Sequence, residues 1–371
     1  MAVLALIVTF LTTGKIHTSY QNLKEKSGLE KSYSISISNE STDQRWDEFL
    51  NNIPGNHYTQ SNLWVRVNEI LGWKPLRLIL SKEQKIVAGV QIFIKEPASV
   101  TNIGYIIKGP IFSLDDHALR EYLFSELSNL ARQKKITFIA LQPPDYAVWV
   151  NELSDFGFQP SNIKMEPTAT ILIDLYMDQE SLLSQMKIQT RYNIRLSQKK
   201  GIVVREGSLN DFNAFYKILK HTARRKQFEI YPIQYFIKMW EVLCPDNHIK
   251  IFLSEFRGKL ISAQLLLIFG DTVINKMGVW SGKHSNLKPN EALLWYSILW
   301  SKKNGYHYFN LEGIDKKAAQ AVLINEPIPD RLKYSFTTFK LGFGGQVKQL
   351  SDVYEYIYNN GIRKFYSHII D

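Results

Sequence analysis

Cysteine is almost absent from this chain of 371 residues, since Cys244 is the only one. A single thiol excludes a disulfide framework and a metal site built from cysteines. The eight histidines are scattered and form no HxxxH pair, so the sequence predicts no metal site. No histidine shares a motif with Cys244, and we therefore interpret this cysteine as a small buried residue and not as a nucleophile.

Familiar catalytic signatures are missing as well. The sequence contains no GxSxG elbow, no GxxxxGK(S/T) loop, no GxGxxG after a strand and no HExxH. Nucleophilic catalysis therefore has no support from the motifs.

Apolar runs long enough to cross a membrane are also missing. The run that begins MAVLALIVTF ends before Lys15, and it is shorter than the roughly 20 residues that a spanning helix needs. It lacks the basic start of a signal peptide. We expect residues 1–33 to form a poorly defined tail and the protein to be cytoplasmic. A weak membrane-surface anchor and a misplaced start codon remain open explanations of the tail.

The length of the chain favours two domains, because 371 residues exceed what one hydrophobic core usually serves. Hydrophobic residues make up 45% and charged residues 22%, as in a soluble globular protein. The net charge of +10 makes nucleic acid, phosphorylated substrates or an anionic membrane surface plausible partners. A protein that is merely rich in lysine is the other interpretation.

A short pattern is repeated in the two halves of the chain. Lys85–Gly89 (KIVAG) resembles Lys259–Ala263 (KLISA), and both follow a polar turn and continue as strand. Gly104–Ile106 and Gly278–Trp280 then follow at the same distance. The period of about 174 residues is too long for a solenoid and predicts duplication of one α/β domain. Chance similarity between two hairpins is the alternative.

Basic residues follow one face of a predicted helix. Residues 179–200 are expected to form one long helix, in which Lys187, Arg191 and Arg195 recur every four residues and Lys199 continues the row. Such a stripe suits a phosphate backbone. A solvated face is the alternative, although no acidic side chains lie four residues away to offset the repulsion.

Two further segments carry candidate binding residues. Arg225 precedes an aromatic cluster that includes Tyr231 and Tyr235, and arginine beside tyrosine can bind anions or stack on rings. Packing in the core is the alternative role for Tyr235. The segment GYHYFNLEG is a predicted strand that ends in a polar turn at Gly313, a place where α/β proteins often bind ligands.

Lys340 lies in the aromatic segment RLKYSFTTFKLGFGG, which we expect to be extended and buried. In a strand, Lys340 would share one face with Thr338, and Phe339 and Leu341 would share the other. An ammonium group there is costly unless it reaches water, an acceptor or a substrate. A functional lysine and a lysine that extends to solvent from an edge strand both fit.

Taken in order, the motifs resemble the Fem family (FemABX) of non-ribosomal aminoacyltransferases, in its armless form. The likeness covers residues 34–355. It rests on these segments: YTQSNLWVRV, KIVAGVQIF, YIIKGPIF, ITFIALQPPD, MKIQTRYNIRLSQKKGIVVREG, ARRKQFEIYPIQYF, GKLISAQLLLIFGDTV, YHYFNLEGID and FTTFKLGFGG.

The resemblance implies a fold of two tandem domains like acyl-CoA N-acyltransferases (GNAT-like), with a cleft between them. We place the first domain at 34–168 and the second at 169–346, and we expect 347–371 to pack back on the first. The implied activity moves an amino acid from aminoacyl-tRNA to the amine of a peptidoglycan-precursor stem peptide. The implied protein is a monomer without a cofactor, and aminoacyl-tRNA is its co-substrate.

The resemblance also assigns residues. Lys340 of the Phe339–Lys340 dipeptide matches the family's catalytic lysine, and the stripe Lys187, Arg191, Arg195 and Lys199 is assigned to tRNA. The resemblance places candidate substrate-binding residues at Arg66, Asn68, Asp145, Arg225, Tyr231, Tyr235 and Phe339.

This sequence departs from the family at both positions that hold the precursor's diphosphate. Asn68 stands where the family has lysine, and Tyr231 stands where it has arginine before PIEYF. Arg66 is a candidate substitute for the missing lysine. These changes favour a lipid-linked over a nucleotide-linked precursor, together with peripheral contact with the membrane.

Two other functions remain open. One is an acyl-CoA-dependent N-acyltransferase of the same fold acting on another amine, although no (R/Q)xxGx(G/A) loop follows a strand to bind the CoA pyrophosphate. The other is a basic RNA-binding module without catalysis.

Overall fold

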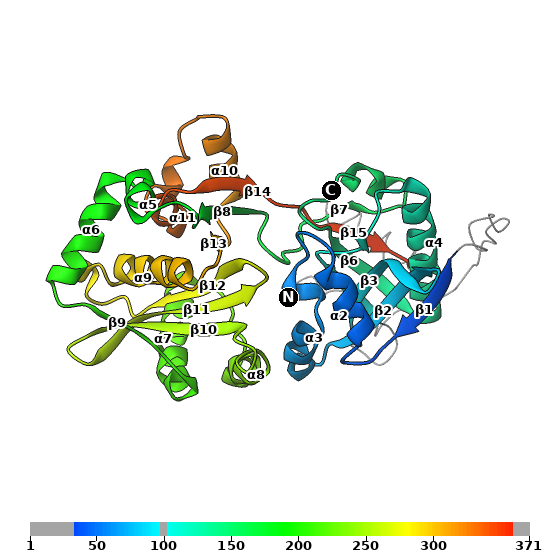
Figure 1. Cartoon of the computed structure of the whole chain (residues 1–371), viewed down its shortest axis with the longest axis horizontal. Coiled ribbons are helices and arrows are strands. Elements are labelled where there is room, and N and C mark those ends of the chain that lie inside the picture. The colour runs from blue at the N-terminus through cyan, green and yellow to red at the C-terminus, as the bar shows by residue number, and fades with distance from the viewer. Residues whose placement is uncertain (1–32, 97–101, 359–371) are drawn as a thin grey trace. The chain divides into compact units, whose positions relative to one another are not determined.

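The computed structural model describes residues 33–96 and 102–358. The chain divides into two compact units (Figure 1): the first ends at Glu166 and resumes at Ser351, and the second runs from Pro167 to Leu350. The expected tail 1–33 and the end of the chain after residue 358 lie outside the described residues, apart from Tyr33.

The first unit is a mixed sheet with helices on both faces. The sheet has the order β1-β2-β3-β4-β6-β15-β7, with β5 paired to β3, and only β4 and β6 run parallel. Its strands are β1 (Ser34–Ser38), β2 (Lys74–Lys82), β3 (Lys85–Lys95), β4 (Asn102–Ile107), β5 (Ile111–Phe112), β6 (Ile136–Gln142), β7 (Gln159–Pro160) and β15 (Tyr354–Ile357). Its helices are α2 (Gln44–Asn51), α3 (Asn62–Asn68) and α4 (His117–Gln133), with short 3₁₀ helices at Tyr58–Gln60, Glu69–Leu71 and Val150–Ser154.

Helices α2 and α4 cover opposite faces of the first sheet. Asp43 caps α2 by accepting a hydrogen bond from the Trp46 amide, and the apolar stripe that starts at Trp46 is buried against Ile79 and Ile111. Asp116 caps α4 in the same way, and its leucines pack on the other face. The two apolar faces of the sheet are thereby both removed from water.

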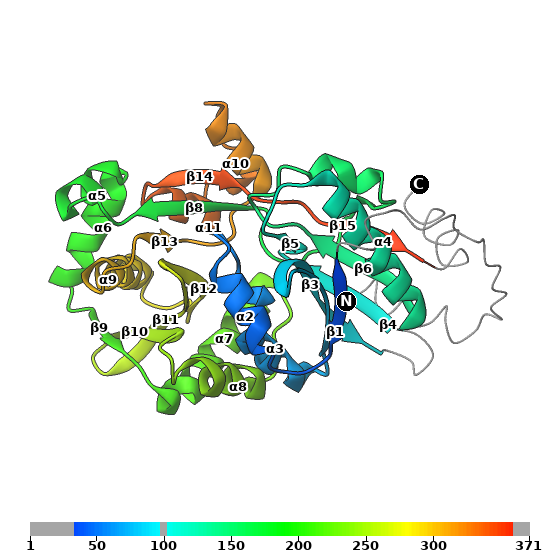
Figure 2. The same ribbon diagram turned by 45° about the vertical axis from the view of Figure 1, so that its right-hand side comes forward.

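The second unit has the same architecture. Its sheet has the order β14-β8-β13-β12-β11-β10-β9, and only β12 and β13 run parallel. Its strands are β8 (Ala169–Asp174), β9 (Val203–Glu206), β10 (Ile249–Phe256), β11 (Lys259–Phe269), β12 (Thr272–Trp280), β13 (Tyr308–Asn310) and β14 (Gln346–Gln349). Its helices are α5 (Gln179–Gln185), α6 (Ile188–Lys199), α7 (Phe212–Lys226), α8 (Ile233–Leu243), α9 (Pro289–Lys303), α10 (Lys316–Leu323) and α11 (Phe336–Leu341), with 3₁₀ helices at Leu209–Asp211, Ser285–Leu287 and Asp330–Leu332. Helices α9 and α7 lie on opposite faces, and α10 lies beside β14 (Figures 1 and 2).

The predicted duplication is confirmed by the topology of the two sheets. Read from opposite ends, both orders place an edge strand first, then two antiparallel hairpin strands, then the parallel pair, then an antiparallel strand and a last edge strand. The hairpins even share a register shift, in which one residue of the second strand has no partner. The pairs on the two sides of the shift are Leu80–Ala88 and Ser81–Ile86 in the first sheet and Ser254–Ser262 and Glu255–Leu260 in the second.

One detail of the repeat was wrong. Gly104 pairs with Ile94, and the residue at that position of the second sheet is Val273, which pairs with Ile268. The match of Gly104–Ile106 to Gly278–Trp280 is therefore out of register. The reason is that the connection between these two paired strands is longer in the first unit: Gly104 follows Ile94 by ten residues, whereas Val273 follows Ile268 by five.

In each sheet, the strand next to one edge begins just after the chain passes from one unit to the other. β8 begins shortly after the chain leaves the first unit at Glu166, and β15 begins shortly after it returns at Ser351. The return differs from the expected start at 347, because residues 346–349 form β14, which pairs with β8 in the second sheet.

Two predicted elements are corrected by the structure. The single helix expected over 179–200 is broken into α5 and α6 at Met186, whose side chain is buried in the core and whose backbone is extended. The strand expected around Lys340 is the helix α11. Ser335 caps this helix by accepting from the Thr338 amide, and Phe339 donates its amide to the Ser335 carbonyl. Lys340 therefore does not share a strand face with Thr338.

Candidate active site

Lys340 lies in the last turn of α11 and points to the polar turn that follows β13. Its Nζ donates a hydrogen bond of 2.8 Å to the carbonyl oxygen of Gly313. The ring of Phe336, one turn earlier on α11, lies 5.3 Å from the same nitrogen. The two segments singled out by the sequence, the Phe-Lys dipeptide and the turn at Gly313, thus meet in the second unit.

An ion pair lies next to this contact. Lys276 Nζ is 3.0 Å from Glu312 Oε1, and Glu312 directly precedes Gly313. Neither residue was predicted from the sequence, although the polar turn that ends GYHYFNLEG marked the right place. A carboxylate and two ammonium groups therefore gather at the carboxyl end of β13.

The conformation of Glu312 is held by its neighbours. Its φ of 56° is in the left-handed region, which few residues other than glycine adopt. Asn310 Oδ1 accepts a hydrogen bond of 2.7 Å from the Glu312 amide, and Thr170 Oγ1 donates one of 3.1 Å to the Glu312 carbonyl. These bonds fix the turn that presents the carboxylate.

The protonation of Lys340 reflects two opposed effects. Burial lowers the pKa of Lys340 to about 8, because the ammonium ion is partly removed from water. The nearby carboxylate of Glu312 acts in the opposite direction and raises this pKa. Lys340 is therefore mostly charged at pH 7 but loses its charge in the mildly alkaline range.

Phe339, the other half of the dipeptide, belongs to the core. Its ring lies 5.3 Å from that of Phe343 in an edge-on arrangement, and the side chain packs on the main cluster of the second unit. This contact anchors α11, so Phe339 has a packing role beside the substrate-binding role predicted for it.

Arg225 is engaged with the end of β12. Its guanidinium carbon lies 4.8 Å above the Trp280 ring, and Nη2 donates 3.0 Å to the Trp280 carbonyl oxygen. Tyr231 is exposed, and its ring lies 4.4 Å from the ring of the buried Tyr235 in a tilted arrangement. The predicted anion-binding cluster is thus assembled in part, with Arg225 already paired to a ring.

Only part of the predicted basic stripe is exposed to solvent. Lys187, Arg195 and Lys199 are exposed on or next to α6. Arg191 differs, because its Nη1 donates to the carbonyl oxygens of Leu183, Ser184 and Met186 at the end of α5. Its guanidinium thus has a capping role that the spacing alone did not reveal.

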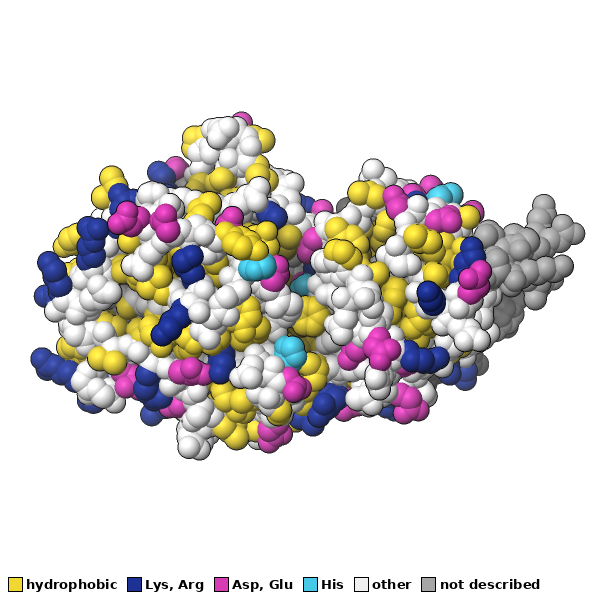
Figure 3. Space-filling view, viewed as in Figure 1, with side chains coloured by type: hydrophobic (Ala, Val, Ile, Leu, Met, Phe, Trp, Pro, Cys, Tyr) yellow, Lys and Arg dark blue, Asp and Glu magenta, His cyan; other side chains and the backbone are white. Residues whose placement is uncertain are grey.

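Positive charge is concentrated in the second unit. Residues 167–350 carry a net charge of about +11, whereas the rest of the chain sums to about −1. Figure 3 shows lysine and arginine side chains gathered along the left edge of this unit, over α6. A polyanion would be attracted to this unit rather than to the first.

The residues predicted in the first unit lie on α3 and in the loop that follows β6. Arg66 is exposed, whereas Asn68 is half-buried and its Nδ2 donates 2.8 Å to the Trp64 carbonyl oxygen. Residues two apart on a helix face different directions. Arg66 therefore does not point where the side chain of Asn68 points.

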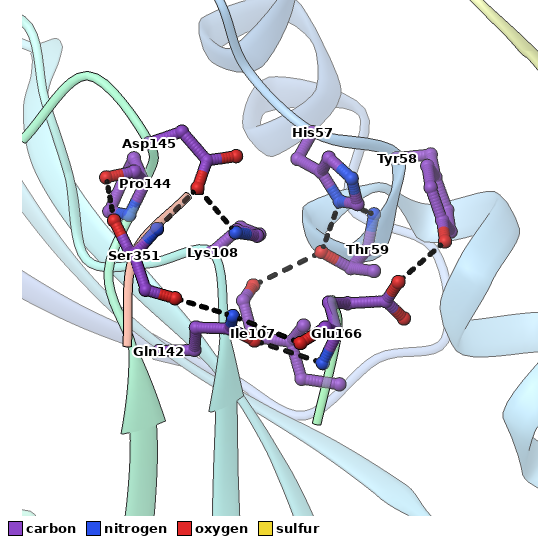
Figure 4. A network of polar contacts seen from close by, with 10 residues as sticks. All are labelled: His57, Tyr58, Thr59, Ile107, Lys108, Gln142, Pro144, Asp145, Glu166 and Ser351. Carbon is purple, nitrogen blue, oxygen red and sulfur yellow. Dashed lines mark hydrogen bonds and ion pairs between the residues drawn. The ribbon is translucent and has the colours of Figure 1, made fainter. Parts of the chain in front are cut away.

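Asp145 takes part in a buried ion pair (Figure 4). Its Oδ1 lies 2.6 Å from Nζ of Lys108, a lysine only 2% exposed, and accepts a further bond of 2.9 Å from the Ser351 amide. A lysine buried to this degree needs such a partner. Asp145 therefore has a structural role in addition to its predicted contact with substrate.

Gln142 joins the two chain crossings. Its Nε2 donates to the carbonyl oxygens of Glu166 (3.2 Å) and Ser351 (2.8 Å), and its Oε1 accepts 2.9 Å from the Glu166 amide (Figure 4). The Glu166 carboxylate in turn accepts from the Tyr58 hydroxyl. The last residue before one crossing and the first after the other are thus held by one buried side chain.

The structure reveals neither a metal cluster nor a spanning helix in the parts it describes. Within residues 33–96 and 102–358, no three His, Cys, Asp or Glu side chains are grouped to hold a metal ion. None of the helices among these residues is long and apolar enough to cross a bilayer.

Comparison with known proteins identifies the family. The model of the FemAB family matches residues 41–155 and 149–259, more than half of the chain. The chain belongs to the FemAB family. The resemblance predicted from the motifs is confirmed.

One curated relative is similar to this chain over part of its length. The Lipid II:glycine glycyltransferase of Staphylococcus saprophyticus is 22% identical over 236 residues, which are 60% of this chain and 57% of the relative. The chain therefore matches little more than half the length of this relative.

Two solved structures share the fold. A crystal structure of FemX has a TM-score of 0.74 at 17% identity and covers 89% of this chain and 99% of its own. A tandem GNAT protein from the clavulanic acid pathway has a TM-score of 0.54 at 10% identity and covers 88% and 99%. The predicted fold of two GNAT-like domains is confirmed.

Proposed function

We propose that this FemAB protein transfers an amino acid from aminoacyl-tRNA to the amine of a peptidoglycan-precursor stem peptide. The observation that carries the proposal is the ammonium of Lys340, half-buried and held at the carboxyl end of β13. A curated relative named for glycyl transfer to lipid II supports a lipid-linked acceptor. Such an acceptor would bring the protein to a membrane surface.

The reaction is an aminolysis of an ester. The neutral amine of the acceptor attacks the ester carbonyl carbon, a C–N bond forms, and the carbonyl oxygen becomes an oxyanion. The charged Lys340 stabilises this oxyanion and needs no covalent bond to the substrate. The C–O bond then breaks, the amine loses its extra proton, and the tRNA ribose hydroxyl leaves in protonated form.

Substrate contacts are assigned to both units. On the first unit, the exposed Arg66 and the free oxygen of Asp145 are candidate contacts for the acceptor, together with Asn68. On the second unit, the exposed Tyr231 is a candidate contact beside Arg225. Each remains a prediction from the family resemblance, with the geometry given above.

The donor tRNA is assigned to the exposed cations of α6. We expect Lys187→Glu, Arg195→Glu and Lys199→Glu, combined in one variant, to weaken tRNA binding and to reduce its dependence on salt. Each lost phosphate contact lowers the slope of log K against log salt by roughly 0.7 to 0.9. Binding measured by fluorescence anisotropy between 50 and 200 mM salt, about the range over which phosphate contacts matter, gives both quantities.

A matched variant controls for net charge. Lys82, Lys85 and Lys134 are exposed on the first unit, and their replacement by glutamate changes the total charge by the same amount. The assignment requires that only the α6 variant loses tRNA affinity and shows a weaker dependence of binding on salt. Equal losses in both variants, or none, would reduce the stripe to a solvated face.

Product analysis tests the function directly. The protein is incubated with a mixed pool of charged tRNA and with either a nucleotide-linked or a lipid-linked precursor, and the products are weighed by mass spectrometry. We expect a mass gain of one amino acid that requires charged tRNA. Transfer from acetyl-CoA alone, or tRNA binding without any product, would overturn the proposal in favour of another acyltransferase or an RNA-binding module.

A further inference from the structure

The duplicated fold allows the candidate site to be compared with its counterpart in the first unit. Parallel pairing joins Ile103 to Phe138 in the first sheet and Thr272 to Tyr308 in the second, so these pairs are equivalent. Four residues further along each strand, the first unit has Ile107 and Gln142, which pair in the sheet. Counted in the same way, the corresponding residues of the second unit are Lys276 on β12 and Glu312, which lies two residues beyond the end of β13.

The two copies have therefore acquired different chemistry at one position. In the first unit, Gln142 is uncharged, and its side-chain amide forms hydrogen bonds to backbone groups. In the second unit, Glu312 offers a carboxylate to Lys276. The fold alone does not require a charge here, because its first copy is built without one.

The backbone around the pair is also unusual. Leu265 pairs with Met277 and Leu267 pairs with Ile274, so two residues of β12 lie opposite Leu266. This β-bulge contains Lys276, and bulges of this kind redirect side chains near active sites. Glu312 adds a left-handed conformation that is unfavourable for a residue with a side chain. Both partners are thus held in irregular backbone.

We propose that Glu312 is a positioning residue for Lys340, which it keeps charged and directed at the reacting carbonyl. The carboxylate belongs to the turn whose next carbonyl, that of Gly313, accepts from Lys340 Nζ. Lys276 anchors the carboxylate through its ion pair and thereby limits how strongly Glu312 attracts Lys340. The catalytic meaning of this arrangement rests on the proposed aminoacyl transfer.

Other charged groups on the neighbouring elements are accounted for by different contacts. Asp315 caps α10 and forms an ion pair with Arg331 at 3.2 Å. Lys333 pairs with Asp330 at 2.8 Å, and Lys187 at the start of α6 is exposed. Glu312 is the carboxylate that raises the pKa of Lys340, in agreement with the geometry.

The test measures the protonation of Lys340 directly, so it does not depend on any assay of transfer. The full chain is labelled with ¹³C-lysine, and the Lys340 signal is assigned by its loss in Lys340→Arg and followed by NMR from pH 6 to 11. In Glu312→Gln, we expect the Lys340 pKa to fall by about one unit, because an attracting charge is removed. Lys276→Met should shift it upward, because a neighbouring positive charge is removed.

Control and activity readouts complete the experiment. Glu326→Gln removes an exposed carboxylate of the same unit and should leave the Lys340 pKa unchanged. In the transfer assay, Glu312→Gln should move the alkaline limb of kcat to lower pH by the same amount with little change in KM. An unchanged Lys340 pKa in Glu312→Gln would overturn the inference even if transfer is observed, whereas a shifted pKa without transfer would refute only the proposed reaction.

Discussion

Replacement of Lys340 by methionine is expected to lower aminoacyl transfer by about two to three orders of magnitude, the usual effect of losing one oxyanion donor. Methionine keeps most of the volume of the lysine stem, so the packing of α11 should survive. Single-turnover rates with charged tRNA measure the loss, and circular dichroism checks that the variant is folded.

The direction in which the same substitution changes stability can also be predicted. The pKa of Lys340 is lower in the folded chain than in the unfolded one, so the charged lysine opposes folding most below pH 8. The free energy of unfolding of Lys340→Met at pH 7 should therefore be unchanged or higher. Lys333→Met, which removes an exposed lysine of the same segment, should leave transfer unaffected. Near-normal transfer by a folded Lys340→Met protein would return Lys340 to a structural role.

Asp145→Ala is expected to destabilise the first unit by about 3 kcal/mol, because it leaves the ammonium of Lys108 buried without its counter-charge. This value is the lower end of the usual loss of stability on breaking a buried ion pair, because the side chain of Asp145 is itself 34% exposed. Hydrogen exchange of amides in β4 and β6 reports the opening of this unit separately from that of the second unit.

A double variant separates the structural role of Asp145 from a role in binding. Lys108→Met combined with Asp145→Ala removes both charges and should recover most of the lost stability. If the double variant is stable but binds the acceptor poorly, Asp145 also contacts substrate. If Asp145→Ala is as stable as the parent protein, the ion pair is not what holds this region.

The duplication could be predicted from the sequence because its signal is local. A polar turn followed by KIVAG or KLISA specifies a hairpin wherever it occurs, and both copies form one. The longer-range match failed because the connection after this strand is five residues longer in the first copy than in the second. Register beyond the first strand pair thus depends on insertions that the repeat does not reveal.

The conformation around Lys340 could not be predicted, because aromatic residues at short spacing suit a strand and a short helix equally well. The N-cap that Ser335 provides favours the helix. The role of Arg191 was hidden for a related reason, since the break at Met186 exposes carbonyls for it to cap. Glu312 and Lys276 lie 36 residues apart, and only the folded sheet brings them together.

The return of the chain to the first unit has a consequence for how the protein can be made. The central strand β6 of the first unit pairs with β15, which ends only at Ile357. A ribosome that has finished residue 166 has therefore not yet produced the strand that completes this sheet. Unlike domains that fold in the order of synthesis, the first unit must wait for the whole second unit to be translated. A stop codon placed before β15 would thus damage the part of the protein made first.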